Sequence, residues 1–149
     1  MKLTTEASVT VPRPQGAVYD HATNAAGYPK VLLPAGIIPG ITGVEDLGSS
    51  RRRVSLSDGS TLDEEVTVLE RPRRYAYHWL TKPKAPFGWL IETGEAEWTF
   101  EAAGSGTSVR WGYVFTLTSP LAAPLALPII PLFRRWMQKG LERIGPTMS

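Results

Sequence analysis

The segment that decides the fold reads Pro120-Leu-Ala-Ala-Pro-Leu-Ala-Leu-Pro-Ile-Ile-Pro131, followed by Leu132-Phe-Arg-Arg-Trp-Met-Gln-Lys-Gly-Leu-Glu-Arg-Ile144. Its second half predicts an amphipathic helix, because apolar residues recur at helical spacing between charged ones. The apolar stripe consists of Leu132, Phe133, Trp136, Met137, Leu141 and Ile144. A long apolar helix placed after many strands needs a sheet to cover it. We therefore expect the preceding chain to form a sheet that curves around this helix, with a ligand cavity between them.

The same region raises the question of a membrane span. No charge occurs from Gly112 to Phe133, which is about the length that crosses a bilayer. However, its first part is strand-like, and prolines at 120, 124, 128 and 131 interrupt the rest. Proline removes a helical hydrogen bond and clashes with the preceding turn. We expect a buried, kinked helix beginning near Pro120, and the alternative is a surface segment that touches lipid.

Composition narrows the class of protein. The chain has 149 residues, 42% hydrophobic and 20% charged, which predicts one folded domain covering residues 1–149. A net charge of +2 is too small to indicate a nucleic-acid partner. The absence of cysteine excludes disulfides and thiolate catalysis. The first residues lack the apolar core of a secretory signal, so we expect a cytoplasmic protein.

Turn signals divide the chain into a strand, two short helices, six further strands and the final helix. The expected strands cover residues 2–11, 41–47, 51–56, 62–70, 75–81, 90–101 and 109–117, and the short helices cover 15–23 and 24–33. An antiparallel meander of this length curls and needs a cover on one face. The order predicts an α+β helix-grip fold, with about seven curved strands wrapped on the long C-terminal helix.

Strand alternation places aromatic residues and two carboxylates on the face toward the helix. The expected inner-face residues are Glu64, Tyr77, Trp79, Glu92, Trp98, Trp111, Tyr113 and Phe115, and Phe133 belongs to the apolar stripe of the helix. Aromatic side chains with a few polar groups are typical of a small-molecule pocket. The alternative is a closed aromatic core with the carboxylates at solvent-exposed strand ends.

Several motifs resemble a known superfamily. They are Val9–Tyr19, Ala26–Pro29, Leu62–Tyr77, Glu95–Phe100 and Gly106–Trp111. With them the chain resembles the START-like, helix-grip superfamily (SRPBCC), and within it the bacterial polyketide cyclase/dehydrase-type proteins. The resemblance implies a curved sheet around a C-terminal helix with a cavity between them. It indicates fold more than function, because the superfamily includes cyclases, lipid and sterol carriers, hormone receptors, quinone binders and chaperone activators.

Aromatase/cyclases of this family are similar in using cavity arginine, tyrosine and aspartate or asparagine residues to fold a poly-β-ketone. This chain departs from that pattern, because the strand that would supply the arginine reads Asp63-Glu64-Glu65. Arg52 on the neighbouring strand is the candidate to face the cavity instead.

Glu64 is the sharpest candidate for chemistry. Desolvation on an apolar face raises the pKa of a carboxyl group, which suits it to general acid or base catalysis. The alternative is a structural ion pair with an arginine such as Arg52. We expect Tyr77 and Tyr113 to act with Glu64 by orienting a substrate oxygen. The residues expected to bind the substrate are Arg52, Trp79, Glu92, Trp98, Trp111, Phe115 and Phe133.

Neither His21 nor His78 has a partner at metal-ligand spacing, so no metal site is expected. The sequence also lacks a nucleotide-binding glycine loop and a Gly-x-Ser-x-Gly elbow. Any reaction would therefore be cofactor-free.

The first functional hypothesis is a cofactor-independent cyclase or dehydratase acting on a hydrophobic, oxygenated, polyketide-like small molecule. The alternative is a non-catalytic carrier of lipid, quinone or polyketide. In that case residues 117–133 and Pro86–Trp89 would form a rim that makes transient contact with a membrane. A third reading, an interaction module, has no specific feature behind it. The sequence leaves the choice between a monomer and a homodimer open.

Overall fold

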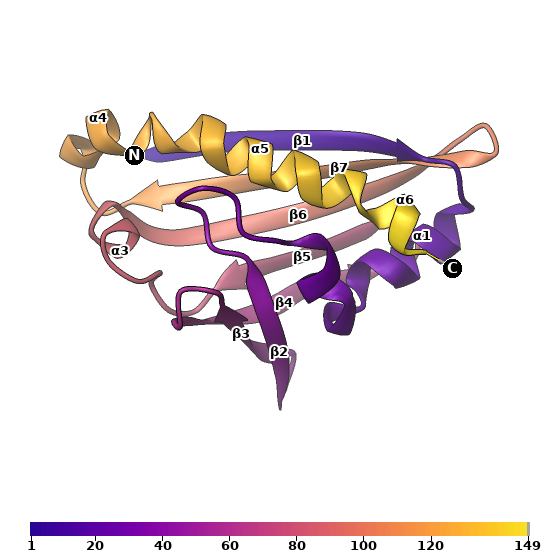
Figure 1. Ribbon diagram of the computed structural model, residues 1–149, viewed down its shortest axis with the longest axis horizontal. Helices are drawn as coiled ribbons and strands as arrows, with labels where there is room; N and C mark the ends of the chain where they lie inside the picture. Colours follow the sequence, from indigo (N-terminus) through magenta and orange to yellow (C-terminus); the bar gives the residue numbers. More distant parts are fainter. Residues whose placement is uncertain (149) are drawn as a thin grey trace.

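Seven antiparallel strands form one curved sheet in the order β1-β7-β6-β5-β4-β3-β2 in the computed structural model, which describes residues 1–148 (Figure 1). The strands are β1 (Lys2–Val11), β2 (Ile41–Gly48), β3 (Arg51–Leu56), β4 (Thr61–Glu70), β5 (Arg74–Trp79), β6 (Ile91–Ala103) and β7 (Gly106–Leu117). Consecutive strands from β2 to β7 are neighbours, and β1 pairs with β7. The predicted α+β helix-grip architecture is confirmed.

All the helices connect or follow these strands, and the longest, α5, lies along one face of the sheet (Figure 1). They are α1 (Gln15–Thr23), the 3-10 turn η1 (Ala25–Gly27), α2 (Tyr28–Val31), α3 (Phe87–Leu90), the 3-10 turn η2 (Pro120–Ala122), α4 (Ala123–Ala126), α5 (Ile129–Glu142) and α6 (Ile144–Thr147). The segment between α2 and β2 passes over the same face as α5 (Figure 1). The inner face of the sheet is therefore covered by α5 and by this segment together.

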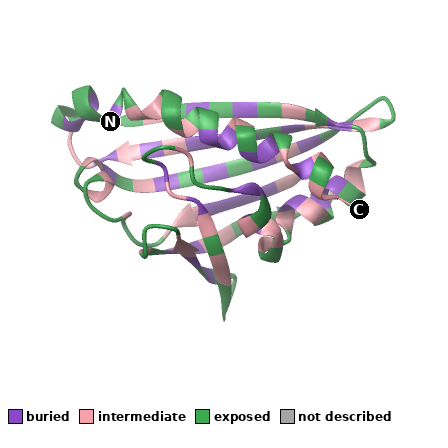
Figure 2. Cartoon of the chain, in the orientation of Figure 1, coloured by how far each residue is buried: buried purple, intermediate pink, exposed green. Residues whose placement is uncertain are grey.

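The tightest part of the core lies beneath the C-terminal half of α5, where Met137 and Leu141 are fully buried against the sheet. Gly140 allows this approach, because a Cβ there would lie 2.6 Å from Cδ2 of Leu32 and 3.9 Å from the ring of Trp111. Figure 2 shows buried residues concentrated along the central strands and on the side of α5 that faces them.

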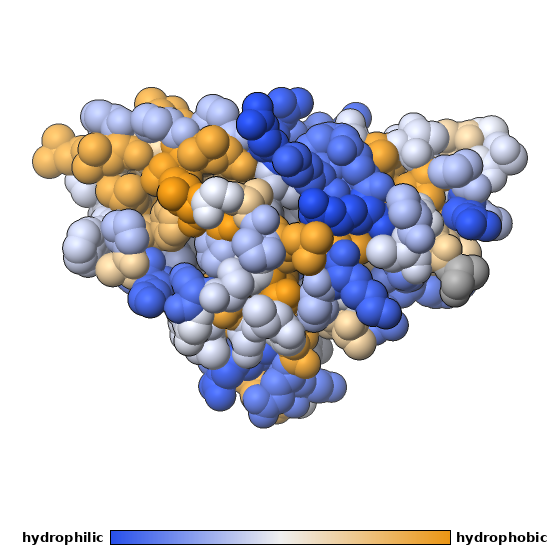
Figure 3. Space-filling model, viewed as in Figure 1, coloured by the Kyte–Doolittle hydropathy of each residue, from blue (hydrophilic) through white to orange (hydrophobic). Residues whose placement is uncertain are grey.

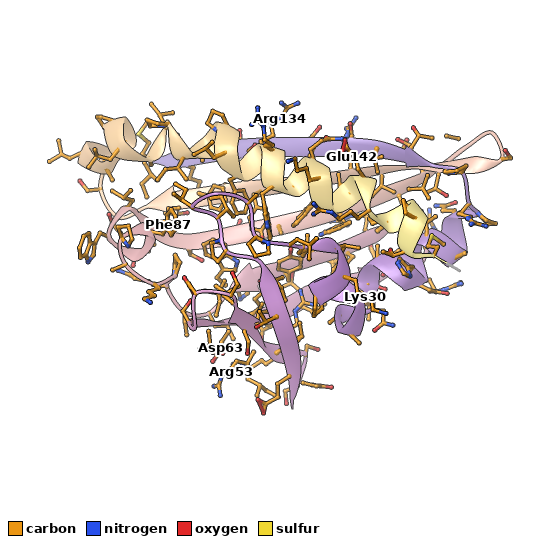
Figure 4. All side chains as sticks on the ribbon, viewed as in Figure 1. Lys30, Arg53, Asp63, Phe87, Arg134 and Glu142 are labelled. Atoms are coloured by element: carbon orange, nitrogen blue, oxygen red, sulfur yellow. The ribbon has the colours of Figure 1, made fainter. Side chains whose placement is uncertain are left out.

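Side chains of α5 also reach the free edge of β1. Gln138 donates to the carbonyl oxygen of Ser8 at 2.9 Å and accepts from its amide at 3.3 Å. One turn earlier, Nε of Arg134 donates to the carbonyl oxygen of Glu6 at 2.9 Å, and Figure 4 labels Arg134 on α5 where the helix runs beside β1. These contacts fix the helix at the strand where the sheet ends.

Three details differ from the sequence-based expectations. The helix expected from Pro120 is divided into η2, α4 and α5, because the prolines remove the hydrogen bonds of a continuous helix. Leu132 is exposed, because at about 100° per residue it lies off the stripe centred on Met137. The short helix α3 was not predicted, since Phe87–Leu90 is too short to show a periodicity.

Candidate functional site

A cavity of about 100 Å³ lies between α5, the sheet, α3 and the segment before β2. Its wall consists of Ile38, Pro39, Ile41, Val54, Leu56, Leu62, Glu64, Trp79, Pro83, Phe87, Ile91, Tyr113, Phe115, Ile129, Ile130, Phe133 and Trp136. Glu64 is the one charged residue in this described wall. Pockets for drug-sized ligands measure about 300–1,000 Å³, so this space encloses a single small ring or one segment of a longer molecule.

Strand pairing brings Arg52 and Glu64 together. The two residues are directly opposite each other in the β3–β4 register, and both point to the inner face, where each is less than a tenth exposed. Nε of Arg52 donates to Oε1 of Glu64 at 2.9 Å, and Nη2 lies 2.9 Å from the same oxygen. Glu64 therefore faces the cavity as expected and also forms the ion pair that was the alternative.

Three tyrosines enclose the guanidinium of Arg52. Nη1 donates to the hydroxyl of Tyr75, which in turn lies 3.0 Å from the hydroxyl of Tyr28. The guanidinium carbon is 4.7 Å from the ring centre of Tyr77, 5.3 Å from that of Tyr28 and 5.6 Å from that of Tyr75. Aromatic faces stabilise a desolvated cation. Arg52 is thus held behind the cavity wall as a fixed counter-charge.

The electrostatics of Glu64 follow from its burial. Burial raises the pKa of its carboxyl group, and the Arg52 guanidinium opposes that shift. Burial would lower the pKa of Arg52, yet its neighbours, Glu64 among them, hold it above its ordinary value. Arg52 therefore stays protonated, and the carboxylate on the cavity floor has a permanent positive partner.

Two polar groups at the cavity, one on Glu64 and one on Trp79, have unused hydrogen-bonding capacity. Oε2 of Glu64 receives no hydrogen bond from residues 1–148, and the buried indole N–H of Trp79 has no partner of good geometry in the same range. The indole nonetheless lies close enough to lower the pKa of both Glu64 and Tyr113. The hydroxyl groups of Tyr113 and Tyr77 form a hydrogen bond with each other, with their oxygens 3.1 Å apart. A ligand oxygen placed here would meet an acceptor, a donor and a phenol.

The structure brings together half of the predicted site residues. Glu64, Trp79, Tyr113, Phe115 and Phe133 all line the cavity. The inward phase of the β5 aromatic residues is confirmed, because Tyr75 and Tyr77 are buried and Trp79 reaches the wall.

Two predicted site residues lie one layer behind the wall. Tyr77 sits behind Tyr113, and Arg52 sits behind Glu64. Both contact wall residues but do not line the cavity. They were predicted to contact a ligand directly, and the structure instead places them in support of the wall.

Trp98 and Trp111 do not line the cavity. They are 3% and 0% exposed, and their ring centres are 4.5 Å apart in a stacked arrangement. Trp111 also packs on Trp136 at 5.7 Å. The inner face of the sheet is longer than the cavity, and α5 closes directly on this part of it. These residues are core aromatics, which was the alternative reading.

Glu92 was expected on the inner face and lies outside instead. The β6–β7 register shifts between Ile91 and Thr93, and such a bulge changes which face a residue points to. The side chain is about half exposed, 3.9 Å from Lys82. Gly94 keeps the inner phase, and the Trp79 ring packs against it so closely that a Cβ would be 3.0 Å from three ring carbons.

Some wall residues that the sequence reasoning missed come from strands and α5, such as Val54, Leu62 and Ile130, and others come from connecting segments. Ile38 and Phe87 form part of the wall, and Figure 4 labels Phe87 on α3, near the N-terminal end of α5. The indole N–H of Trp136 donates to the carbonyl oxygen of Leu33 at 2.8 Å, which ties the segment before β2 to α5. Neither segment carries a strand or helix periodicity, so only its apolar residues signalled burial.

A second, wider groove lies on the outer face of the sheet, with hydroxyl and charged side chains around it. Arg110 in this groove is already paired with Glu6 at 3.2 Å. Within residues 1–148, no group of three or more His, Cys, Asp or Glu side chains could hold a metal ion. The cavity at Glu64, which is lined mainly by apolar side chains, is therefore the stronger candidate site.

A curved seven-stranded sheet around α5, with a cavity between them, defines a START-like protein of the helix-grip class. The family described as "Polyketide cyclase / dehydrase and lipid transport" matches residues 2–148, and the chain belongs to that family. No curated protein sequence matches the chain significantly. No helix among the described residues is long and apolar enough to cross a bilayer.

Solved structures share the fold at low sequence identity. A START superfamily protein from Mycobacterium smegmatis is 12% identical with a TM-score of 0.75, over 98% of this chain and 99% of that one. The Zhui aromatase/cyclase from a Streptomyces species is 19% identical with a TM-score of 0.72, over 98% and 93% of the two chains. The di-domain ARO/CYC protein BexL is 17% identical with a TM-score of 0.69, over 99% of this chain and 50% of that one. At these identities the likeness shows the fold alone.

Proposed function

We propose that this protein binds a hydrophobic, oxygenated small molecule in the cavity at Glu64 and acts on it as a cofactor-independent enzyme of the cyclase or dehydratase type. The observation that carries the proposal is a buried carboxylate with one oxygen outside its contacts with Arg52, next to the buried indole N–H of Trp79, in a cavity wall with no other charged residue. The description of the family names this reaction class together with lipid transport.

Glu64 would act as the base. A carbonyl-bearing ligand would place its oxygen toward the N–H of Trp79 and the hydroxyl of Tyr113, with the adjacent carbon near Oε2. Glu64 would take the proton from that carbon, and the two donors would stabilise the charge that develops on the oxygen. The resulting enolate would attack a second carbonyl of the ligand, whose alkoxide then takes the proton back from Glu64, or it would expel a β-hydroxyl, which leaves as water with that proton.

Arg52 would keep this base ionised. The guanidinium is fixed on Oε1, so the second oxygen remains directed at the ligand. Because burial raises the pKa of Glu64, the carboxylate is a stronger base than an exposed glutamate.

Proton abstraction can be tested without knowing the natural substrate. Small aryl ketones have α-protons that exchange slowly with solvent, so the protein can be assayed for deuterium incorporation in D₂O by NMR. Ketone binding is measured separately by quenching of tryptophan fluorescence. We expect Glu64→Gln to keep ketone binding, because its amide oxygen still accepts from Arg52, and to slow the exchange by about 100-fold or more.

Glu65→Gln is the matched control, because Glu65 is the next residue on β4 and lies on the outer face beside Arg51 and His78. It should leave both measurements unchanged. Exchange by Glu64→Gln at the wild-type rate would refute the catalytic role.

A non-catalytic carrier is the second candidate. It is favoured by the Arg52–Glu64 ion pair, which satisfies part of the carboxylate within the protein, and by the apolar character of the remaining wall. Native mass spectrometry of purified protein tests it. A lipid or quinone that is bound by wild type and by Glu64→Gln alike, and recovered chemically unchanged from both, would support the carrier.

A further inference from the structure

The surface from Pro120 to Leu132 has an unusual composition. Every exposed residue in this stretch is a proline or a leucine. The exposed positions are Pro120, Leu121, Pro124, Leu125, Leu127, Pro128, Pro131 and Leu132. Trp89 of α3, which is 73% exposed, belongs to the same end of the molecule, because α3 packs against α4. We call these nine residues the leucine rim.

The rim inverts the usual arrangement of a surface helix. Ala122, Ala123 and Ala126 point inward and are buried, whereas Leu121 and Leu125 are 87% and 66% exposed. A helix that only covers a core turns its large apolar side chains inward. Contiguous exposed apolar surface of this kind marks a site that contacts a protein or a membrane.

The rim lies next to residues that line the cavity. Phe87 of α3 and the residues Ile129 and Ile130 of α5 line the cavity, and the rim residues flank them in the same segments. Figure 3 shows apolar residues gathered over the α4 end of the molecule, with hydrophilic residues further along α5. A hydrophobic ligand leaving the cavity on this side would meet the leucine rim first.

Basic residues flank the segments of the leucine rim along the chain. Lys82 packs its Cβ near Gly88 of α3, Lys84 follows in the same loop, and Arg134 and Arg135 come directly after the rim on α5. The residues from 112 to 133 include no acid, whereas Glu92 and Asp58 are acidic neighbours of Lys82 and Lys84. This pattern is complementary to a surface that is apolar inside and anionic outside.

We propose that the leucine rim docks on an anionic lipid bilayer, so that the cavity exchanges its hydrophobic ligand with the membrane. The docking stands on the surface alone, and the exchange rests on the proposed function. A bilayer fits better than a second copy of the chain, because a stable dimer buries about 800 Å² per partner and the rim is made of two single-turn helices and their flanks. Interfacial insertion needs only a few leucines, an indole and nearby cations.

Vesicle flotation tests the docking. The probe is a set of phosphatidylcholine vesicles with or without phosphatidylglycerol. We expect wild type to bind the anionic vesicles, and to bind less at high salt and on neutral vesicles. Leu121→Ser combined with Leu125→Ser should weaken the partition at least about tenfold.

Leu69→Ser is the matched control. Leu69 is 66% exposed on β4 near the β5 turn, at the other end of the strand from α3. Its binding should equal that of wild type. Because the rim leucines are exposed, thermal melts should show that all variants fold. Glu64→Gln should float like wild type, which separates a failure of docking from a failure of the proposed chemistry.

Two results would overturn the proposal. One is a wild-type protein that does not float with anionic vesicles, or a double leucine variant that floats with them as well as wild type does. The other is a concentration-dependent dimer in sedimentation equilibrium that the double leucine variant abolishes, since the rim would then be the interface of a second copy.

Discussion

Replacing Arg52 by Met is the sharpest test of how the polar cluster is balanced. Met keeps most of the apolar volume but removes the guanidinium that lies 2.9 Å from Oε1 of Glu64 and donates to Tyr75. Removing one partner of a buried ion pair leaves an uncompensated charge and costs about 3–5 kcal/mol. We expect a loss of this size in the free energy of unfolding, measured by urea denaturation with tryptophan fluorescence at about pH 8.

The stability cost of Arg52→Met should change with pH, and the direction of that change follows from the pKa of Glu64. Without Arg52, the group that lowers the pKa of Glu64 is gone, and burial raises that pKa further above its ordinary value of 4.5. A carboxyl group with a raised pKa in the folded state stabilises the fold below its unfolded pKa, and this stability is lost as pH rises through the folded pKa. The cost of Arg52→Met should therefore be smaller at about pH 5 than at about pH 8.

Two further variants complete the test. Adding Glu64→Leu to Arg52→Met removes the stranded carboxylate, so the double variant should recover most of the loss. Arg53→Met is the matched control: Arg53 is the next residue on β3, and it pairs with Asp63 on the exposed side at 2.9 Å (Figure 4). It should change stability little, because solvent screens exposed ion pairs. A small, pH-independent effect of Arg52→Met would refute the reasoning.

Three other predictions concern the cavity. Gly94→Ala should destabilise the protein by about 1–3 kcal/mol and weaken ligand binding, because its Cβ would push the Trp79 ring into the cavity; thermal denaturation and fluorescence quenching measure the two effects. If Glu64 is the base, kcat/KM for the ketone exchange should fall as pH drops through its pKa, since only the ionised form accepts a proton. The midpoint of this fall should lie above the ordinary carboxyl pKa of 4.5. A midpoint below that value would contradict the assignment. Trp136→Phe removes the donor to Leu33 and should cost about 1 kcal/mol, with faster hydrogen exchange in the segment before β2.

Local pattern predicted the elements well, because alternation and turn residues act over a few positions. The aromatic strand β5 shows this: the prediction placed Tyr77 and Trp79 inward, and the structure agrees. The predicted orientation of Glu92 is wrong for a local reason. One register shift reverses the face to which the side chain points, and residue alternation alone does not indicate such a shift.

The extent of the cavity could not be predicted in the same way. Trp98 and Trp111 have the correct phase and still lie in the core, since the position of α5 along the strands decides where a gap remains. Ile38 and Phe87 enter the wall from segments without periodicity. The partnership of Arg52 with Glu64 needed the strand register, which follows from turn geometry and bulges rather than from composition.

The contacts between α5 and the first strand have a consequence for self-association. At Ser8, the amide of Gln138 both donates and accepts, which is what the backbone of an eighth strand would do. The carbonyl of Glu6 is likewise occupied by Arg134. At the opposite border, β2 is interrupted by two register shifts, and irregular borders resist pairing with other chains. The sheet is thus terminated on both sides, and a change that detaches α5 would expose a template for amyloid-like growth as well as an open cavity.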